Sequence, residues 1–408
     1  MQQDKCSPFY SIPRFGENEP EKPKADLLEQ EKNNAYIKSV YDATMAVFES
    51  DKSPKRILEK KEYSTVFPKL LITKTGYQVV EILNCFDPNG YLPAMARVES
   101  VETDKLYFAK VQMRKPIEKV SGTDHNILLR ELYVLGNWID KPKEETKYLT
   151  KLADCGFDDN FRFILIEDAF TNLKILQNSR NKMPRNFVFL LTYHSFQAVK
   201  QLHQAHFMHC DLHPACFTIS PPFSLKIKNF YRASFTTSTR NLVIKKLRTT
   251  AFSSRKAYKI GEKLELLDDY ENWFHVIMHA TCKNGLPWKE ETADLQAKEK
   301  FYELLDADWF GSADMLCLIP HLLKKYRSVR KFESAVDELF SINVKMFDKN
   351  EAPDWGFFVP EEKPKKSTRK KKIGDRGRNN GKNQHRSGEA GKTKTEETDV
   401  KIYGLASD

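Results

Sequence analysis

The chain has 408 residues, of which 40% are hydrophobic and 12% aromatic, so it can bury one large core or two moderate ones. No apolar run reaches the length that spans a bilayer, and no apolar segment follows the first five residues, so we expect neither a membrane span nor a signal peptide. The seven cysteines are scattered and never spaced as Cys-x-x-Cys, which indicates free thiols in a reducing compartment. These features predict an intracellular protein that is cytoplasmic, nuclear or both.

The net charge of +10 is concentrated near the C-terminus. Between Lys363 and Lys394 there are 13 Lys or Arg residues and two acidic residues, so this stretch alone carries a net charge of +11. The rest of the chain is therefore close to neutral, which excludes a strongly basic nucleic-acid-binding surface on the folded part.

The first residues predict an extension in front of the main domain. Residues 1–24 are rich in Pro, Glu and Lys and lack periodicity, so we expect them to be extended or disordered. Apolar residues recur at helical spacing over 26–50 and predict one helix, which packs either on the main domain or on a partner. A charged linker follows, and we assign residues 1–62 to an N-terminal extension.

The next part of the chain is predicted to be rich in strands. Alternation of apolar and polar residues predicts strands over 77–83, 94–101 and 106–112 and, after a helix over 124–138, further strands over 149–157 and 162–167. The sequence Asp87-Pro88-Asn89-Gly90 predicts a turn between the first two strands.

The remaining part is predicted to be helical. Helical patterns begin after Lys174 and extend over 186–206, 268–282, 304–325 and 332–347, with interruptions expected near Gly311 and Pro320. Strands in the first third and helices in the rest predict an α+β fold of two lobes. From Glu361 onward there are almost no apolar residues, so we expect a disordered basic tail, which we assign to residues 356–408.

Two neighbouring segments carry the most information about function, His209–Phe217 and Leu225–Tyr231. They resemble the catalytic loop and the metal-binding loop of protein kinases, whose patterns run His-Arg-Asp, then Asn, then Asp-Phe-Gly. Three further segments resemble the casein kinase 1 group, near its tau-tubulin kinase and vaccinia-related kinase branches. These are Leu267–Phe274, Asn284–Lys289 and Pro353–Trp355.

The resemblance implies a bilobal protein-kinase-like fold over residues 70–355. A small β-rich lobe with one helix would cover residues 70–167, and a larger helical lobe would cover residues 168–355. Within the small lobe, Lys110 stands where kinases place the lysine that binds the α and β phosphates, and Glu131 stands where its ion-pair partner lies. The alternative is that Lys110 is a surface lysine at a strand edge and Glu131 a solvated helix residue.

By position alone, Ile166 to Ala169 resembles the hinge between the two kinase lobes, whose backbone groups meet the adenine ring. Ile166 would then gate the back of the pocket, with Glu167 and Ala169 beside the nucleotide. Together with Lys110 and Glu131, these residues make up the ATP site that the resemblance implies.

In the larger lobe, Asp211 occupies the place of the catalytic Asp that accepts the proton of the substrate hydroxyl. His213 replaces the Lys that steadies the transferring phosphate, and an unperturbed His is mostly uncharged at neutral pH. His209 and Asp269 match residues that hold the family's catalytic loop in place. Cys210 replaces the Arg of the family motif.

Several departures from the kinase pattern predict impaired catalysis. Cys216 and Asn229 replace the two Mg²⁺ ligands, although Mg²⁺ prefers oxygen ligands that carry negative charge. The loop Asn84–Tyr91 has one glycine where the family has three, so its side chains would crowd phosphate away from the backbone amides. We therefore expect no metal and no cofactor, with ATP binding left open only in a weak or Mg²⁺-independent form.

These observations leave several readings of the function. The leading one is a pseudokinase that serves as a scaffold or allosteric partner of other proteins. The alternative is an active, divergent Ser/Thr kinase that transfers the ATP γ-phosphate. A third is a zinc-binding loop, because five zinc-type ligands lie within eleven residues. They are His206, His209, Cys210, His213 and Cys216.

Two polar segments allow further interpretations. The run Lys363–Lys372 resembles a nuclear-localisation signal or a contact for anionic partners, and a solubilising tail is the alternative. Thr236 to Thr239 lies close to Arg232, Arg240 and two lysines, so a phosphate there would order the segment; the alternative is an ordinary polar loop.

Overall fold

The computed structural model of the chain describes residues 34–42 (except 36 and 40), 70–72, 76–84, 93–113, 127–157, 161–167, 171–178, 183–221, 223–236, 250–259, 262–282, 284–288, 295–304 and 316–344. All of these residues belong to one unit of the chain, Met1–Phe358. The basic tail assigned to residues 356–408 lies outside the described residues.

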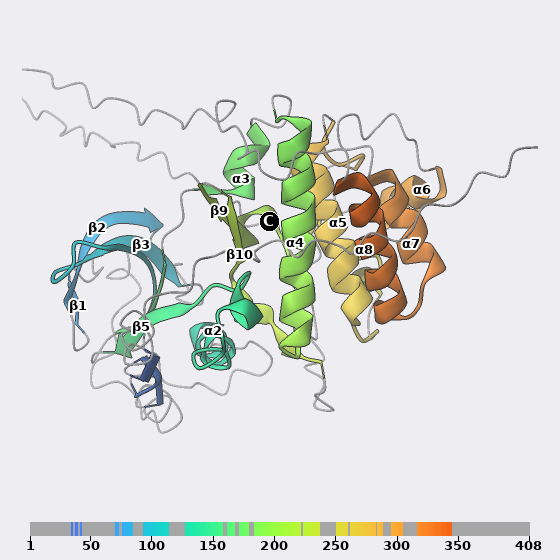
Figure 1. Cartoon of the computed structure of the whole chain (residues 1–408). Coiled ribbons are helices and arrows are strands. Elements are labelled where there is room, and N and C mark those ends of the chain that lie inside the picture. Colours follow the sequence, from blue (N-terminus) through green and yellow to red (C-terminus); the bar gives the residue numbers. More distant parts are fainter. Residues whose placement is uncertain are drawn as a thin grey trace, which may run out of the picture. The chain divides into compact units, whose positions relative to one another are not determined.

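The first part of the described chain forms one antiparallel sheet of six strands in the order β1-β2-β3-β4-β6-β5 (Figure 1). The strands are β1 (Leu70–Ile72), β2 (Gly76–Asn84), β3 (Ala94–Ser100), β4 (Leu106–Met113), β5 (Leu152–Phe157) and β6 (Phe161–Glu167). The five strands predicted here are confirmed, with ends that differ by one to three residues. The short β1 was not predicted, because three residues are too few to establish an alternation.

The two faces of this sheet have different roles, because successive side chains of a strand point to opposite sides. One face carries a small apolar cluster of its own: Tyr77, Ala94, Ala96, Val98, Ala109, Val111, Phe161, Phe163 and Leu165. The opposite face carries Lys110 and contacts helix α2 (Ile127–Gly136). The sheet therefore presents Lys110 to α2 from the centre of a rigid strand.

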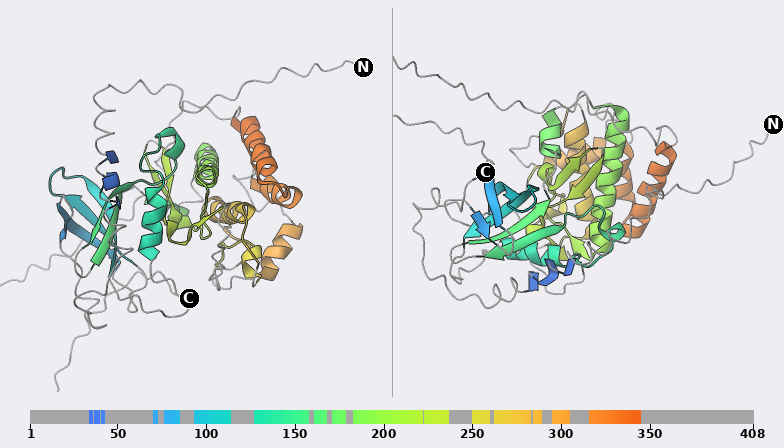
Figure 2. Two further views of the ribbon diagram at one scale, coloured as in Figure 1. Left: turned by 90° about the horizontal axis from the view of Figure 1, so that it is seen from below. Right: turned by 60° about the vertical axis from the view of Figure 1, so that its left-hand side comes forward.

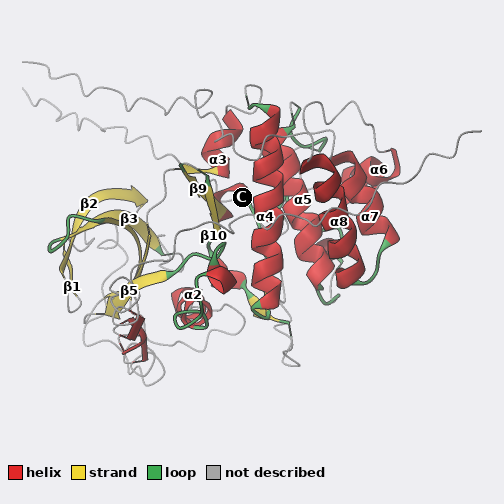
Figure 3. Ribbon diagram, viewed as in Figure 1, coloured by secondary structure: helices red, strands yellow, loops and turns green. Residues whose placement is uncertain are grey.

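The second part of the described chain is mostly helical (Figure 3). Its helices are α3 (Leu173–Leu176), α4 (Arg185–Gln204), α5 (Leu266–Thr281), α6 (Leu295–Leu304), α7 (Ile319–Lys325) and α8 (Val329–Val344). Helix α7 begins at Ile319, so a helix boundary lies next to Pro320, where the sequence predicts an interruption. Pro320 lies in the first turn of α7, where its missing N–H and fixed φ suit a helix start. Gly311 lies outside the described residues.

Helix α5 lies beside α4 (Figure 1) and is buried on every side from Asp268 to Thr281. It begins with a capping box in which the Glu265 amide donates to Asp268 Oδ2 at 2.7 Å, which satisfies backbone groups that the first turn leaves unpaired. Trp273 joins the two helices through a 2.8 Å hydrogen bond from its Nε1 to Ser195 Oγ. A helix buried all round fixes the side chains at its ends, including Asp269.

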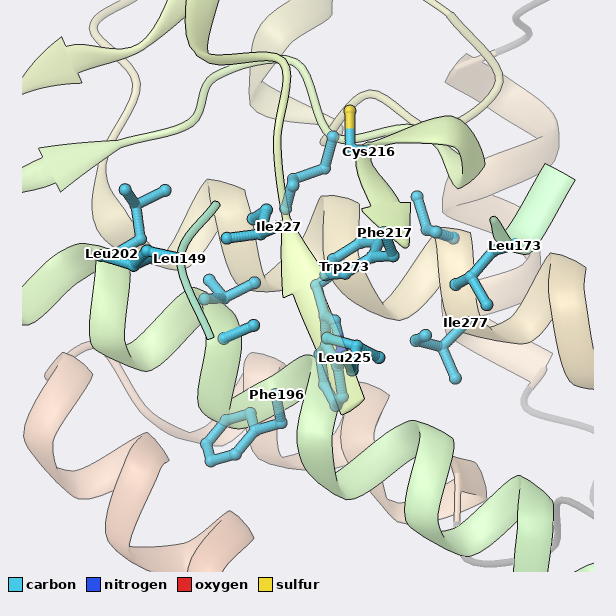
Figure 4. Packing of buried hydrophobic residues seen from close by; sticks show 14 of the residues in the cluster. Leu149, Leu173, Phe196, Leu202, Cys216, Phe217, Leu225, Ile227, Trp273 and Ile277 are labelled. Carbon is cyan, nitrogen blue, oxygen red and sulfur yellow. The ribbon is translucent and has the colours of Figure 1, made fainter. Parts of the chain in front are cut away.

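Short elements hold the two segments that carry the functional signal. A three-stranded sheet is formed by β10 (Ser224–Ile227), β9 (Phe217–Ser220) and β7 (Thr171–Asn172), and β8 (Phe207–Met208) pairs with β11 (Ser234–Phe235). The 3-10 turns are η2 (Glu144–Thr146), η4 (Pro214–Cys216), η5 (Phe230–Arg232) and η6 (Lys256–Tyr258). Figure 4 shows Cys216 at the margin of the buried apolar cluster, with its sulfur turned away from Phe217 and Trp273.

Part of the predicted N-terminal helix is described and is helical at residues 34–35, 37–39 and 41–42, named here the N-terminal segment. Ile37 and Tyr41, one helical turn apart, are both buried in the main core. The segment lies beside α2 (Figure 2). Together, these elements confirm the predicted α+β fold class.

Candidate functional site

Lys110 and Glu131 form the buried ion pair that the sequence predicts. Lys110 Nζ lies 2.6 Å and 2.7 Å from the two carboxylate oxygens of Glu131, and the side chains are 3% and 1% exposed. Strand β4 fixes the lysine and helix α2 fixes the carboxylate, so the pair joins the sheet to the helix. The alternative of two independent surface residues is therefore wrong.

Asn229 completes the surroundings of Lys110. Its Oδ1 accepts a hydrogen bond from Lys110 Nζ at 2.8 Å, and the neighbouring amide of Phe230 donates to Glu131 Oε1 at 3.2 Å. Asn229 has φ 70° and ψ 53°, in the left-handed region that Asn tolerates better than most residues. The ammonium group of Lys110 is thus satisfied entirely by side chains of this protein.

Asp211 is also held by groups of the same chain. The hydroxyl of Tyr231 donates to Asp211 Oδ2 at 2.8 Å, and Arg232 Nε lies 3.6 Å from the same oxygen. Burial, followed by the charge of Asp211, raises the pKa of Tyr231 well above its ordinary value, so its phenol keeps the proton that it donates. The carboxylate therefore already has a hydroxyl donor and a cation beside it.

Cys216 and His213 are electrically neutral at physiological pH. Burial raises the pKa of Cys216 far above its ordinary value, and its Sγ donates to the Asp211 carbonyl at 3.6 Å. Burial also lowers the pKa of His213 to about 4, although the charge of Asp211 opposes this shift. His213 consequently brings no positive charge to the surroundings of Asp211.

Asp269 holds the backbone that leads to Asp211. It accepts from the amides of His209 at 2.6 Å and Cys210 at 2.9 Å, while His203 Nε2 lies 3.1 Å away. Burial alone would raise the pKa of Asp269, but the hydrogen bond and charge of His203, with His209 and the Cys210 amide, lower it. A charged carboxylate at the end of α5 therefore fixes the loop, including Cys210 at φ 64°.

Phe108 is a feature of the site that we did not predict. It lies two residues before Lys110 on β4, hence on the same face of the sheet, and directly opposite Arg97 and Ile166 in the neighbouring strands. Lys228 Nζ lies over its ring, 4.6 Å from the centroid. The alternation of β4 was sufficient to place it on this face, because Phe108 and Lys110 are two residues apart in a predicted strand.

The strand next to Phe108 brings charge to the same face. Arg97 Nη1 lies 3.0 Å from Glu81 Oε2, and both side chains are about one third exposed. The side chain of Asn84 bonds back to the amide of Met95 at 2.5 Å, and residues 85–92 lie outside the described residues. The face around Lys110 thus carries a phenylalanine and an ion pair.

Ile166 and Glu167, two of the residues predicted at the hinge, lie at the end of β6. Ile166 is buried, whereas Glu167 is exposed and accepts a hydrogen bond from Lys226 Nζ at 2.6 Å, with Lys105 Nζ 3.8 Å from its Oε1. Burial opposes ionisation, but the charges of Lys226 and Lys105 lower the pKa of Glu167 below its ordinary value. Ala169 lies outside the described residues, so its predicted role stays untested.

Four of the five residues considered as zinc ligands have other surroundings. His209 Nε2 lies 3.0 Å from the Lys228 carbonyl, and the Cys216 thiol donates to Asp211. Cys210 is buried against Asp269, while His206 is exposed. Within the described ranges, no group of three or more His, Cys, Asp or Glu side chains is arranged to hold a metal ion.

Other predicted segments are only partly described. Thr236 is described, and its amide donates to the His206 carbonyl at 2.9 Å, whereas Thr237 to Thr239 are outside the described residues. The same holds for Pro353–Trp355 and for the basic run Lys363–Lys372. Among the helices that the structure describes, none combines the length and apolar character needed to cross a membrane.

In comparisons with known proteins, no protein-family model matches this chain, and no curated protein matches it significantly in sequence.

Proposed function

We propose that this chain is a catalytically impaired protein-kinase-like protein of the casein kinase 1 group, a pseudokinase that acts as a scaffold or allosteric binding partner. One observation carries the proposal: the carboxylate of Asp211, which would have to accept the proton of a substrate hydroxyl, is already engaged within the chain. The hydroxyl of Tyr231 donates to its Oδ2 at 2.8 Å, and Arg232 Nε lies 3.6 Å from the same oxygen.

The donor set beside these groups does not suit Mg²⁺. Mg²⁺ takes hard oxygen ligands in octahedral geometry, commonly with carboxylates among them. Cys216 presents a neutral thiol, and the one oxygen of the Asn229 side chain already accepts from Lys110. Without metal charge near the phosphates, the chief stabilisation of phosphoryl transfer is missing.

The surroundings of Lys110 also disfavour an adenine ring. Such a ring binds between apolar surfaces, and small side chains leave the necessary gap. Here the face of the sheet that carries Lys110 also carries Phe108, with Lys228 over its ring. A nucleotide would have to displace this cation–π contact and one bond of Lys110 before binding.

A thermal-shift titration with ATP, with and without Mg²⁺, tests the proposal. The wild-type protein should show no saturable stabilisation, because a ligand that binds only the native state raises its stability as its concentration exceeds Kd. A rebuilt variant with Phe108→Ala, Cys216→Asn, Asn229→Asp and Tyr231→Gly should gain Mg²⁺-dependent stabilisation. Adding Lys110→Met to the rebuilt variant is the matched control and should remove the gain. Strong saturable stabilisation of the wild type by Mg-ATP would refute the proposal.

One observation favours a second candidate, an active divergent Ser/Thr kinase. The Lys110–Glu131 pair, which an active kinase requires, is formed and buried. Transfer of labelled phosphate from ATP to a protein substrate would support this candidate if Asp211→Asn abolished it. Activity that persists in Asp211→Asn would have to come from a contaminant.

Protein partners and a nuclear location belong to the same proposal. The basic run Lys363–Lys372 would bind an import receptor or another anionic surface. Imaging of the full chain and of a chain ending at residue 360 tests this role. An unchanged distribution between nucleus and cytoplasm would rule it out.

A further inference from the structure

The N-terminal segment and helix α2 fit together at a single glycine. A Cβ atom built on Gly136 would collide with the ring of Tyr41, so the close approach depends on glycine at this position. Tyr41 is 8% exposed and Ile37 is 6% exposed, which shows that the segment covers part of the main core. The face of α2 around Gly136 is therefore a docking surface, and its occupant is the chain's own N-terminal segment.

The segment is held by few side chains. A cavity of about 450 Å³ lies beside Tyr41, lined by Lys38, Tyr133, Gly136, Asn137, Asp140 and Lys141. Apart from Ile37 and Tyr41, the described residues of the segment are partly or fully exposed. Regions with few buried contacts open at a lower free-energy cost than the core does, so we expect this contact to open more readily than the core that α2 packs against.

Helix α2 connects this contact to the candidate site. Glu131 of α2 bonds Lys110 and also accepts from the amide of Phe230, the first residue of η5. Further along α2, the ring of Tyr133 packs edge-on against Phe235 at 5.7 Å. Any movement of α2 would therefore shift η5, which also contains the Tyr231 that covers Asp211.

We infer that the N-terminal segment is an intramolecular brace that holds α2 in place. It thereby preserves the hydrogen bonds from Lys110 to Asn229 and from Tyr231 to Asp211. Displacement of Tyr41 would allow α2 to move and η5 to shift with it, which would release Tyr231 from Asp211. The segment would therefore regulate access to Asp211. This coupling lies within the fold and does not require that a nucleotide binds.

Hydrogen exchange on the full chain tests the brace. Tyr41→Ala and Gly136→Ala should each accelerate exchange of the amides of residues 229–236 by about tenfold or more, together with those of α2. Ser39→Ala, an exposed position on the same segment, should leave both regions unchanged. Val336→Ala, a buried position on α8, controls for general destabilisation and should not single out residues 229–236.

The double variant Tyr41→Ala/Gly136→Ala gives an independent readout. Alanine favours a helix more than glycine does, so Gly136→Ala should be neutral or stabilising once the ring of Tyr41 is gone. In the wild-type background the same substitution should lower the melting temperature. Equal effects of Gly136→Ala in both backgrounds, or faster exchange confined to α2, would overturn the inference.

Discussion

Replacement of Lys110 by methionine tests whether the Lys110–Glu131 pair supports the fold as well as the site. The substitution leaves Glu131, whose side chain is 1% exposed, with the hydrogen bond from the amide of Phe230 but without its cationic partner. Removing one partner of a buried ion pair costs about 3–5 kcal/mol, because the remaining charge is uncompensated. For a domain of this size that corresponds to a fall in melting temperature of roughly 6–15 °C.

The double variant Lys110→Met/Glu131→Leu separates two contributions to the free energy of unfolding. One is the cost of leaving a buried charge without a partner, and the other is the net stabilisation that the ion pair provides. Replacing both partners by apolar side chains is often close to neutral. Here it also leaves Asn229 Oδ1 and the Phe230 amide without their partners, which costs about 1–3 kcal/mol. We therefore expect the double variant to be more stable than Lys110→Met alone.

Chemical denaturation of wild type, both single variants and the double variant gives the coupling energy directly. A loss below about 1 kcal/mol for Lys110→Met would mean that water reaches the pair, and the reasoning from its burial would then be wrong. A double variant less stable than Lys110→Met would equally refute it.

Two further predictions concern groups outside the pair. Asp269→Asn should destabilise the protein by about 2–3 kcal/mol, because an amide cannot accept from both His209 and Cys210 while facing His203. The deficit, measured by denaturation, should shrink as the pH falls through the lowered pKa of Asp269, since that carboxylate stabilises the fold only while ionised. Lys298, whose Nζ donates to the carbonyls of Thr250 and Ser253, has a pKa lowered to about 7 by burial. Between about pH 7 and 10 the unfolded chain binds the proton of Lys298 and the folded chain does not, so the free energy of unfolding should rise with pH. The variant Lys298→Met should lack that rise. Identical pH profiles in the two proteins would contradict the lowered pKa of Lys298.

Local patterns were sufficient to predict much of the fold. Five strands of the main sheet and helices α4, α5 and α8 follow from apolar spacing, and their ends differ from prediction by a few residues. The interruption expected near Pro320 coincides with the start of α7 at Ile319, because proline breaks a helix interior but favours its first turn. Helix α6 was not predicted, since the exposed residues among its ten positions leave only a weak apolar pattern.

The residues of the candidate site could be predicted from the sequence more readily than the hydrogen bonds that join them. Lys110 and Glu131 could be paired because their positions resemble those of the kinase lysine and its ion-pair partner. The bond from Tyr231 to Asp211 spans 20 residues and that from Lys110 to Asn229 spans 119, so both depend on the tertiary arrangement. The left-handed backbone at Asn229, which sets the direction of both Asn229 and η5, leaves only a weak sequence signal.

These connections explain why the departures from the kinase pattern belong together. An aspartate at position 229 alone would meet Lys110 at hydrogen-bond distance and form a stronger pair with it, since Lys110 already donates to the oxygen there. Cys216 would still be a neutral thiol, and Tyr231 would still occupy Asp211. Removing Tyr231 alone would leave Arg232 beside Asp211 and would not change the neutral side chains of Cys216 and Asn229. None of these single changes both frees Asp211 and supplies metal ligands. If the proposed function is right, rebuilding the site therefore requires simultaneous changes at these positions.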